Sequence, residues 1–229
     1  MSGNNLRENE IRAWMCEIGK CVWQKGWGAA NDGNLTVKLG ENRFLATPSG
    51  VSKGFMKPEM MTVVDAEGTV LEGAAGCRVT SELKVHLSCY RLRPDIGAVI
   101  HAHPPIATAY AVAGIPLDGR YMPETAYALG AVPIAEYAAP GSDKLAQSVE
   151  PFLQEHDALL LANHGAVSVG KDLTGAYYTM ETLEFLAQLT LHTTLIGKAN
   201  RLSEKEMLGI LESRRKNGAS GRHPGMKVY

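Results

Sequence analysis

Two histidines, His101 and His103, follow the apolar run Ala98-Val99-Ile100 and lie two positions apart. Valine and isoleucine favour extended backbone, in which alternate side chains point to the same face. The two imidazoles therefore project together from the end of a predicted buried strand, and at this spacing they can bind one metal ion. The pair alone is a weak signal, because a lone histidine is more often a structural residue.

A third histidine strengthens the metal interpretation. His164 stands 61 residues after His103 and follows a second apolar run, Leu159-Leu160-Leu161-Ala162. Two buried strands that both end in histidine predict a single site at one edge of a sheet. Neutral imidazoles bind Zn²⁺ tightly, and three protein ligands leave room for substrate oxygens.

Small polar residues gather in three short segments that precede the histidine pair. These segments are Gly33-Asn34, Pro48-Ser49-Gly50 and Thr80-Ser81-Glu82. The third is expected to open a helix, where hydroxyls, unpaired amides and the helix dipole together bind phosphate well. Turn geometry and helix capping would account for each segment taken alone.

Together and in this order, the segments and the three histidines resemble the class II aldolase/adducin family over nearly the whole chain. The resemblance implies that His101, His103 and His164 ligate one Zn²⁺ per subunit, with another divalent metal left open. It implies that Glu82 is a metal ligand at rest and the acid/base during turnover. It also implies that the substrate phosphate is held by Asn34, Ser49, Gly50, Thr80 and Ser81.

The activity implied by this resemblance is that of a carbon–carbon lyase. The aldolase branch cleaves ketose phosphates, such as L-fuculose 1-phosphate, to dihydroxyacetone phosphate and an aldehyde through a metal-stabilised enediolate. Glutamate at position 82 favours this branch over the L-ribulose-5-phosphate 4-epimerases, which carry aspartate there. An epimerase and a phosphosugar decarboxylase remain alternatives. A non-catalytic, adducin-like interaction module is a further alternative, against which the joint presence of the three histidines and Glu82 argues.

The aldehyde end of the substrate site is less well defined. The resemblance implies a tyrosine donated by a neighbouring subunit, and Tyr121 lies at about the matching distance after the histidine pair. Residues 123–127 depart from the family pattern, so Glu124 and Tyr127 remain alternatives for this role. The same resemblance implies a homotetramer with its active sites at subunit interfaces.

Apolar periodicity and turn signals predict a single α/β domain over residues 1–229. The resemblance implies a layered α/β/α fold with a central, mostly antiparallel or mixed sheet. Helices are expected at 6–25, 80–91, 106–112, 142–155, 173–196 and 203–215. Strands are expected at 35–39, 44–47, 60–64, 69–71, 97–103, 132–135, 158–162 and 166–170. Residues 117–131 are expected to form a loop or loose helix, and 218–229 a mobile C-terminal tail.

Composition limits the remaining possibilities. The chain is 45% hydrophobic and 21% charged, with a net charge of −1, so no overall field recruits nucleic acid or a membrane. The four cysteines show no disulfide pattern, and no apolar run is long enough to cross a bilayer, which favours a cytoplasmic protein. The other histidines match no ligand position; His86 and His192 are expected to be surface or packing residues within helices.

Overall fold

The computed structural model describes residues 8–229. The helices within this range are α1 (Glu8–Gln24), α2 (Leu83–Leu92), α3 (Pro105–Ala113), α4 (Pro123–Ala128), α5 (Asp143–Val149), α6 (Leu173–Ile196) and α7 (Glu204–Lys216). The strands are β1 (Asn34–Gly40), β2 (Arg43–Ala46), β3 (Thr62–Val64), β4 (Val70–Glu72), β5 (Ala98–Ala102), β6 (Ile134–Ala135), β7 (Ala158–Leu161) and β8 (Gly165–Gly170). No helix of the described part is both long and apolar enough to span a membrane.

The strands form one sheet in the order β4-β3-β2-β1-β5-β8-β7-β6. Strand β8 pairs antiparallel with both β5 and β7, so β5 and β7 run in the same direction on either side of it. Both therefore finish at the same end of the sheet, which we call the histidine end. Strand β1 is antiparallel to β5 and starts there, with Asn34 opposite His101.

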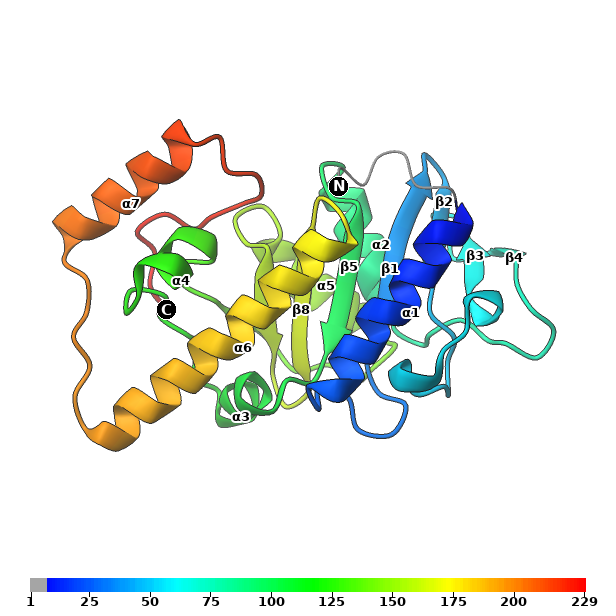
Figure 1. Ribbon diagram of the computed structural model, residues 1–229, viewed down its shortest axis with the longest axis horizontal. Coiled ribbons are helices and arrows are strands. Elements are labelled where there is room, and N and C mark those ends of the chain that lie inside the picture. The colour runs from blue at the N-terminus through cyan, green and yellow to red at the C-terminus, as the bar shows by residue number, and fades with distance from the viewer. Residues whose placement is uncertain (1–7) are drawn as a thin grey trace.

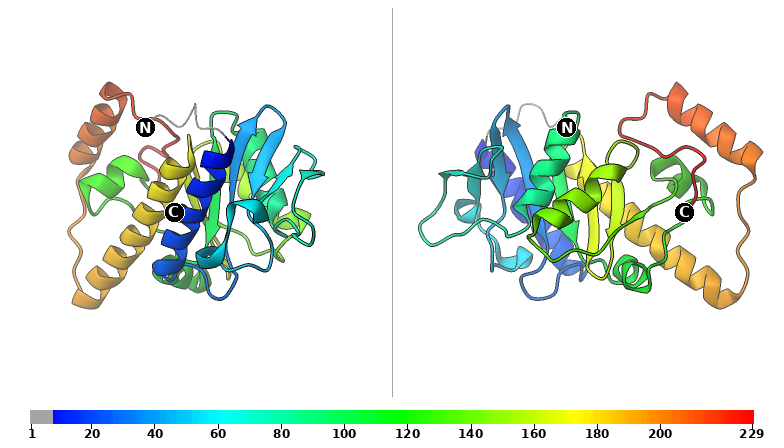
Figure 2. Two further views of the ribbon diagram at one scale, coloured as in Figure 1. Left: turned by 45° about the vertical axis from the view of Figure 1, so that its right-hand side comes forward. Right: turned by 180° about the vertical axis from the view of Figure 1, so that it is seen from behind.

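Helices cover both faces of the sheet (Figure 1). Helices α1, α3 and α6 lie on one face, and α2 and α5 lie on the other, as the view from behind in Figure 2 shows. Strand residues alternate between the two cores: Ile100 packs with the α1 and α6 side, whereas Val99 packs with α2 and α5. This alternation is the period of two expected of a strand covered on both faces. The three-layer α/β/α fold with a mostly antiparallel sheet is thus confirmed.

The largest differences from the expected helix boundaries are at the start of α2 and the end of α5. Helix α2 begins at Leu83 with Glu82 as its N-cap, because Thr80 Oγ1 instead accepts the Glu82 amide at 3.3 Å. Helix α5 ends at Val149 and a short 3₁₀ turn, Glu150–Phe152, follows. Pro151 explains this early end, since its ring removes a backbone donor. Within 117–131, where either a loop or a loose helix was expected, Pro123–Ala128 forms α4.

The last residues of the chain pack against the rest of the domain. The backbone N–H of Arg222 donates to Asp157 Oδ2 at 2.9 Å, and His223 Nε2 donates to the carbonyl of Ala126 at 2.7 Å. The hydroxyl of Tyr229 lies 2.7 Å from His156 Nε2. These contacts anchor several points of 218–229; the mobility of this segment stays a prediction.

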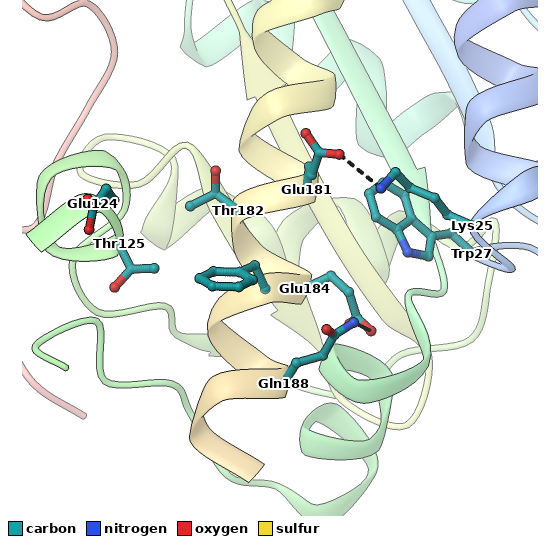
Figure 3. A pocket seen from close by; sticks show the side chains of 9 residues that line it. Lys25, Trp27, Glu124, Thr125, Glu181, Thr182, Glu184 and Gln188 are labelled. Carbon is teal, nitrogen blue, oxygen red and sulfur yellow. Dashed lines mark hydrogen bonds and ion pairs between the residues drawn. The ribbon is translucent and has the colours of Figure 1, made fainter. Parts of the chain in front are cut away.

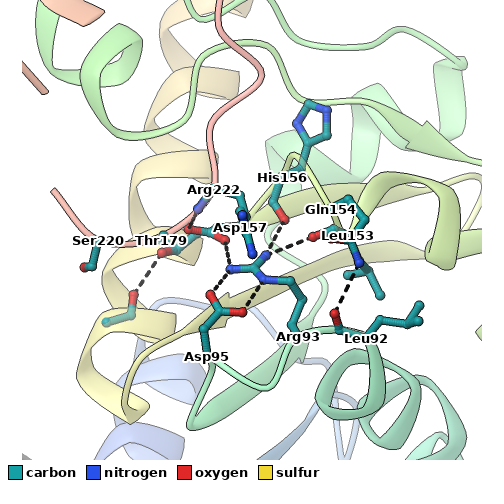
Figure 4. Close-up of polar contacts among 12 residues, drawn as sticks. Leu92, Arg93, Asp95, Leu153, Gln154, His156, Asp157, Thr179, Ser220 and Arg222 are labelled. Carbon is teal, nitrogen blue, oxygen red and sulfur yellow. Dashed lines mark hydrogen bonds and ion pairs between the residues drawn. The ribbon is translucent and has the colours of Figure 1, made fainter. Parts of the chain in front are cut away.

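A buried arginine lies at the opposite end of the sheet from the histidines (Figure 4). The guanidinium of Arg93 donates to both carboxylate oxygens of Asp95 and to Asp157 Oδ1, each at 2.8 Å. It also donates to the carbonyls of Leu153 and His156. Asp157 directly precedes β7, and Asp95 lies three residues before the start of β5. One cation therefore joins the starts of two strands that run in the same direction to the end of α2.

We expect Arg93→Met to lower the free energy of unfolding by about 3 kcal/mol, because it removes the cation paired with the Asp157 carboxylate and the donor to two carbonyls. This loss lies at the lower end of the range for breaking a buried ion pair, because the side chain of Asp95 is 43% exposed and can be solvated by water. Urea unfolding of both proteins measures the difference. The control is Arg91→Met, which removes an arginine that is 65% exposed and paired with Glu150, and should cost less than about 1 kcal/mol. Equal losses in the two variants would contradict the role assigned to Arg93.

Candidate functional site

Three histidine side chains converge at the histidine end of the sheet. His101 lies on β5, His103 follows it, and His164 lies in the turn between β7 and β8. One ring nitrogen from each lies within 4.8 Å of the others, and Nε2 of His101 is 3.0 Å from Nε2 of His103. The prediction that two separate strands bring their histidines together is therefore confirmed by the topology.

The protonation of these rings suits metal binding. Nδ1 of His101 donates to the carbonyl of Ala166 at 3.0 Å, which leaves the Nε2 lone pair directed at the cluster. Burial and the neighbouring histidines hold the pKa of His101 well below its usual value, and burial with His164 lowers the pKa of His103. The ligand nitrogens of tetrahedral zinc lie about 3.3 Å apart, given Zn–N bonds of about 2.05 Å. His101 and His103, with lowered pKa values and Nε2 atoms 3.0 Å apart, therefore suit a divalent ion such as Zn²⁺.

Two glycines make the close packing of the histidines possible. A Cβ on Gly165 would lie 2.5 Å from His103 Cδ2 and 2.7 Å from the carbonyl of Ala102. Gly33 has a φ of +78°, and a Cβ there would lie 3.1 Å from the carbonyl of His101. A side chain at either position would displace the ligand-bearing strand, which gives the Asn-His-Gly and Gly-Asn sequences a steric reason.

The carboxylate of Glu82 lies against the histidine cluster and is buried. Oε2 accepts from Asn34 Nδ2 at 3.0 Å and lies 3.0 Å from His101 Nε2. Oε1 lies 3.1 Å from His164 Nε2 but has no hydrogen-bond partner among the described residues. A carboxylate with one anchored oxygen and one free oxygen beside three imidazoles can ligate a cation and can also exchange a proton.

The three polar segments come together around Glu82. Leu35, next to Asn34, donates its amide to Thr47 Oγ1 at 3.1 Å, and Ser49 donates its amide to the carbonyl of Arg78 at 2.7 Å. An isolated β-bridge joins Pro48 to Val79. The candidate phosphate ligands are therefore neighbours: Thr80 is buried, and Ser49, Gly50 and Ser81 are exposed.

Sequence reasoning missed a buried lysine beneath these turns. Nζ of Lys53 donates to the carbonyl of Asn31 at 3.0 Å and to that of Val51 at 2.6 Å, and so joins the loop before Asn34 to the loop after Gly50. Burial lowers the pKa of Lys53 to about 8, and nearby Asp32 opposes this shift. The isolated lysine in a turn gave no signal that it would be enclosed.

His86 is a second residue whose role the sequence did not reveal. Of the two expected positions, surface or packing, the structure shows packing, because His86 is fully buried, and it adds two hydrogen-bond partners. Nδ1 lies 2.8 Å from Thr36 Oγ1, and Nε2 lies 2.6 Å from Asn34 Oδ1. Its position four residues after Glu82 on the same helix face was the available signal. His192, by contrast, is exposed on α6, in agreement with the prediction.

The candidates for the aldehyde end have partners elsewhere in this chain. Arg201 donates to the hydroxyl of Tyr121 at 3.3 Å and lies over its ring. Arg214 donates to the carbonyl of Tyr127 and lies over that ring. Glu124 lines a cavity of about 470 Å³ between α4, α6 and the end of α1, which Figure 3 shows with Trp27 and Glu184. The histidine cluster does not line this cavity.

Comparison with known proteins identifies related chains. Residues 13–191 match the model of the family described as Class II Aldolase and Adducin N-terminal domain. A 3-oxo-tetronate 4-phosphate decarboxylase of Pectobacterium atrosepticum is 34% identical over 186 residues, which cover 80% of this chain and 84% of that protein. An L-fuculose phosphate aldolase of Methanocaldococcus jannaschii is 35% identical over 182 residues, 80% of this chain and 96% of that protein.

The fold is also shared with solved structures. An L-fuculose 1-phosphate aldolase superimposes with a TM-score of 0.83 at 29% identity, covering 93% of this chain and all of that one. The similarity includes the sheet that carries the three histidines, so the arrangement of the candidate site rests on a fold found in an aldolase.

Proposed function

Because this chain belongs to the class II aldolase and adducin family, we propose that it is a zinc-dependent aldolase that cleaves a ketose phosphate to dihydroxyacetone phosphate and an aldehyde. The observation that carries the proposal is the place of Glu82, which touches His101 and His164 while Asn34 holds its Oε2. A proton carrier and a set of metal ligands thus meet at one point. A scaffold protein has no use for such a buried carboxylate among histidines.

The metal and the phosphate are assigned to separate groups of residues. His101, His103, His164 and, at rest, Glu82 would hold the divalent ion. When bound, this ion would supply Lewis-acid stabilisation of negative charge that develops on the ketose oxygens. The phosphate would be held by side chains and amides of the converging turns, at Asn34, Ser49, Gly50, Thr80 and Ser81.

Glu82 performs the proton transfer at carbon. In the condensation direction, its carboxylate removes a proton from the carbon of dihydroxyacetone phosphate that attacks the aldehyde; in cleavage it returns that proton. Oε1 is the oxygen available for this transfer, because Oε2 accepts the hydrogen bond from Asn34 whereas Oε1 accepts none among the described residues. Tyr121 would donate to the aldehyde oxygen from a neighbouring subunit.

We extend the proposal to a cytoplasmic homotetramer with interface sites. The assembly is supported by exposed apolar side chains on α1 and α6, including Trp14, Trp23, Tyr178 and Phe185. The four cysteines are free thiols, as expected in a reducing compartment.

A decarboxylase is the second candidate, favoured by the 34% identity to the Pectobacterium enzyme. Release of carbon dioxide from a 3-oxo-tetronate 4-phosphate leaves a carbanion on the same carbon of dihydroxyacetone phosphate as aldol cleavage does. Glu82 would protonate it in either reaction. The two reactions differ at the leaving group, since decarboxylation needs no group that deprotonates a substrate hydroxyl.

A substrate panel tests the proposal. We expect metal-loaded protein to release dihydroxyacetone phosphate together with an aldehyde from at least one ketose 1-phosphate, without forming epimers. The panel should contain ketose 1- and 5-phosphates and a 3-oxo-tetronate 4-phosphate, with product assays for triose phosphate, aldehyde and carbon dioxide. Carbon dioxide release alone would favour the decarboxylase, and epimer formation would contradict both.

A further inference from the structure

A continuous chain of buried hydrogen bonds runs from the core to the carboxylate of Glu82. The hydroxyl of Tyr90 lies 2.9 Å from Thr36 Oγ1, which lies 2.8 Å from His86 Nδ1. Nε2 of His86 lies 2.6 Å from Asn34 Oδ1, and Asn34 Nδ2 donates to Glu82 Oε2 at 3.0 Å. The four residues behind Glu82 are each no more than 5% exposed.

Local geometry places these groups in one row. Glu82, His86 and Tyr90 are spaced four apart, so they lie on one face of α2 and its N-cap. Asn34 and Thr36 are two apart on β1 and point to the same face of the sheet, the one that α2 covers. Helix and strand therefore interdigitate, and each polar group of one meets its partner on the other.

The carboxylate of Glu82, at one end of this hydrogen-bond chain, determines which group donates in each of the hydrogen bonds. A carboxylate only accepts, so Asn34 must present Nδ2 to Glu82 and Oδ1 to His86. His86 then donates from Nε2, and its Nδ1 accepts from the hydroxyl of Thr36, which in turn accepts from Tyr90. Burial, the main cause, lowers the pKa of His86 to about 3, so the ring is neutral and has a single N–H to place.

We propose that His86 is a positioning residue: it holds the amide of Asn34 with its N–H toward Glu82, and so fixes the carboxylate where it exchanges a proton with substrate. Without His86 the amide can turn and present Oδ1 to the carboxylate, which repels it. The inference rests on the proposed function, because it assigns His86 to the proton transfer at the carbon of dihydroxyacetone phosphate.

The first test does not depend on turnover. Nitrogen-15 NMR of histidine-labelled protein should show His86 as the Nε2–H tautomer, and His86→Gln supplies the assignment by loss of the signal. A Nδ1–H tautomer would overturn the proposed direction of the network.

The second test measures exchange of the carbon-bound proton of dihydroxyacetone phosphate with deuterium in metal-loaded protein. We expect His86→Leu to lower kcat for exchange about 10- to 100-fold, which is the range typical of residues that hydrogen-bond to a functional group and fix its orientation. KM should change less than kcat, because four of the five assigned phosphate ligands, Ser49, Gly50, Thr80 and Ser81, do not contact His86. His86→Gln keeps a donor near the position of Nε2 and should recover most of the loss.

Thr36→Val tests the same network in case the His86 variants fold poorly. The substitution is nearly isosteric and removes only the hydroxyl. We expect it to lower kcat about 3- to 10-fold because, of the two neutral hydrogen bonds that it removes, only the one to His86 bears on the orientation of Asn34. His192→Leu, on the exposed face of α6, is the matched control and should exchange like wild type. Metal content and thermal unfolding are recorded for each variant.

The outcomes separate the two proposals. Absence of exchange by the wild-type protein would overturn the proposed function and the role of His86 with it. Exchange by wild type that persists in His86→Leu and Thr36→Val would overturn the positioning role alone. A loss that His86→Gln does not recover, accompanied by an equal loss of thermal stability, would mean that His86 serves only in packing.

Discussion

Glu82→Gln should abolish exchange of the carbon-bound proton of dihydroxyacetone phosphate, with a loss in rate on the order of 10³-fold. Glutamine has the same shape as glutamate and can still accept the Asn34 hydrogen bond at Oε1. It cannot take up a proton at any accessible pH. The substitution therefore removes the acid/base group while leaving the packing around it almost unchanged.

Deuterium incorporation measured by NMR gives this result directly, and the metal content of the variant separates its two assigned roles. Retention of the metal with loss of exchange would support Glu82 as the acid/base. The control is Glu212→Gln, which removes a half-exposed carboxylate paired with Lys216 on α7 and should leave exchange unchanged. Exchange by Glu82→Gln at the wild-type rate would exclude Glu82 from the proton transfer.

His101→Ala should remove the metal. Structural zinc in small domains contributes about 10–16 kcal/mol over four ligands, so one ligand accounts for roughly 3 kcal/mol and a loss in affinity on the order of 10²- to 10³-fold. His101 is the most buried of the three and is held by the Ala166 carbonyl, so no neighbouring group can replace its nitrogen. Activity in the substrate panel should disappear with the metal.

Elemental analysis after desalting tests this expectation. Wild type should retain one divalent ion per chain, and His101→Ala should retain less than a tenth of that, a figure that follows from the affinity loss above. His192→Ala is the control, because His192 lies on the exposed part of α6 and matches no ligand position. A full metal content in His101→Ala would refute the ligand assignment.

The convergence of the three histidines could be predicted because each follows an apolar run at the end of a strand. Parallel directions of β5 and β7 then bring them to one end of the sheet. The polar turns could likewise be predicted, because glycine, serine and threonine are typical of turns and of helix starts. Apolar periodicity and turn signals predicted an α/β fold, and the family resemblance supplied its three-layer architecture.

The residues that were missed depend on tertiary packing. Nothing in the order of amino acids says that α2 covers β1, so His86 and Thr36 gave no sign that they would meet. Arg93 is similar: two carboxylates far apart in sequence, Asp95 and Asp157, enclose it. The end of α5 at Val149 could have been inferred from Pro151, whereas the start of α2 depends on how Thr80 binds the Glu82 amide.

The position of Arg93 has a consequence for how such a protein can change over evolutionary time. The arginine ties β5 and β7 together at their beginnings, and the reactive groups stand where those strands finish. Substitutions in the turns around the substrate therefore do not loosen the main ionic attachment of the sheet. A lineage built on this plan can acquire a new leaving group, such as a different aldehyde or carbon dioxide, while the framework beneath the site keeps its stability.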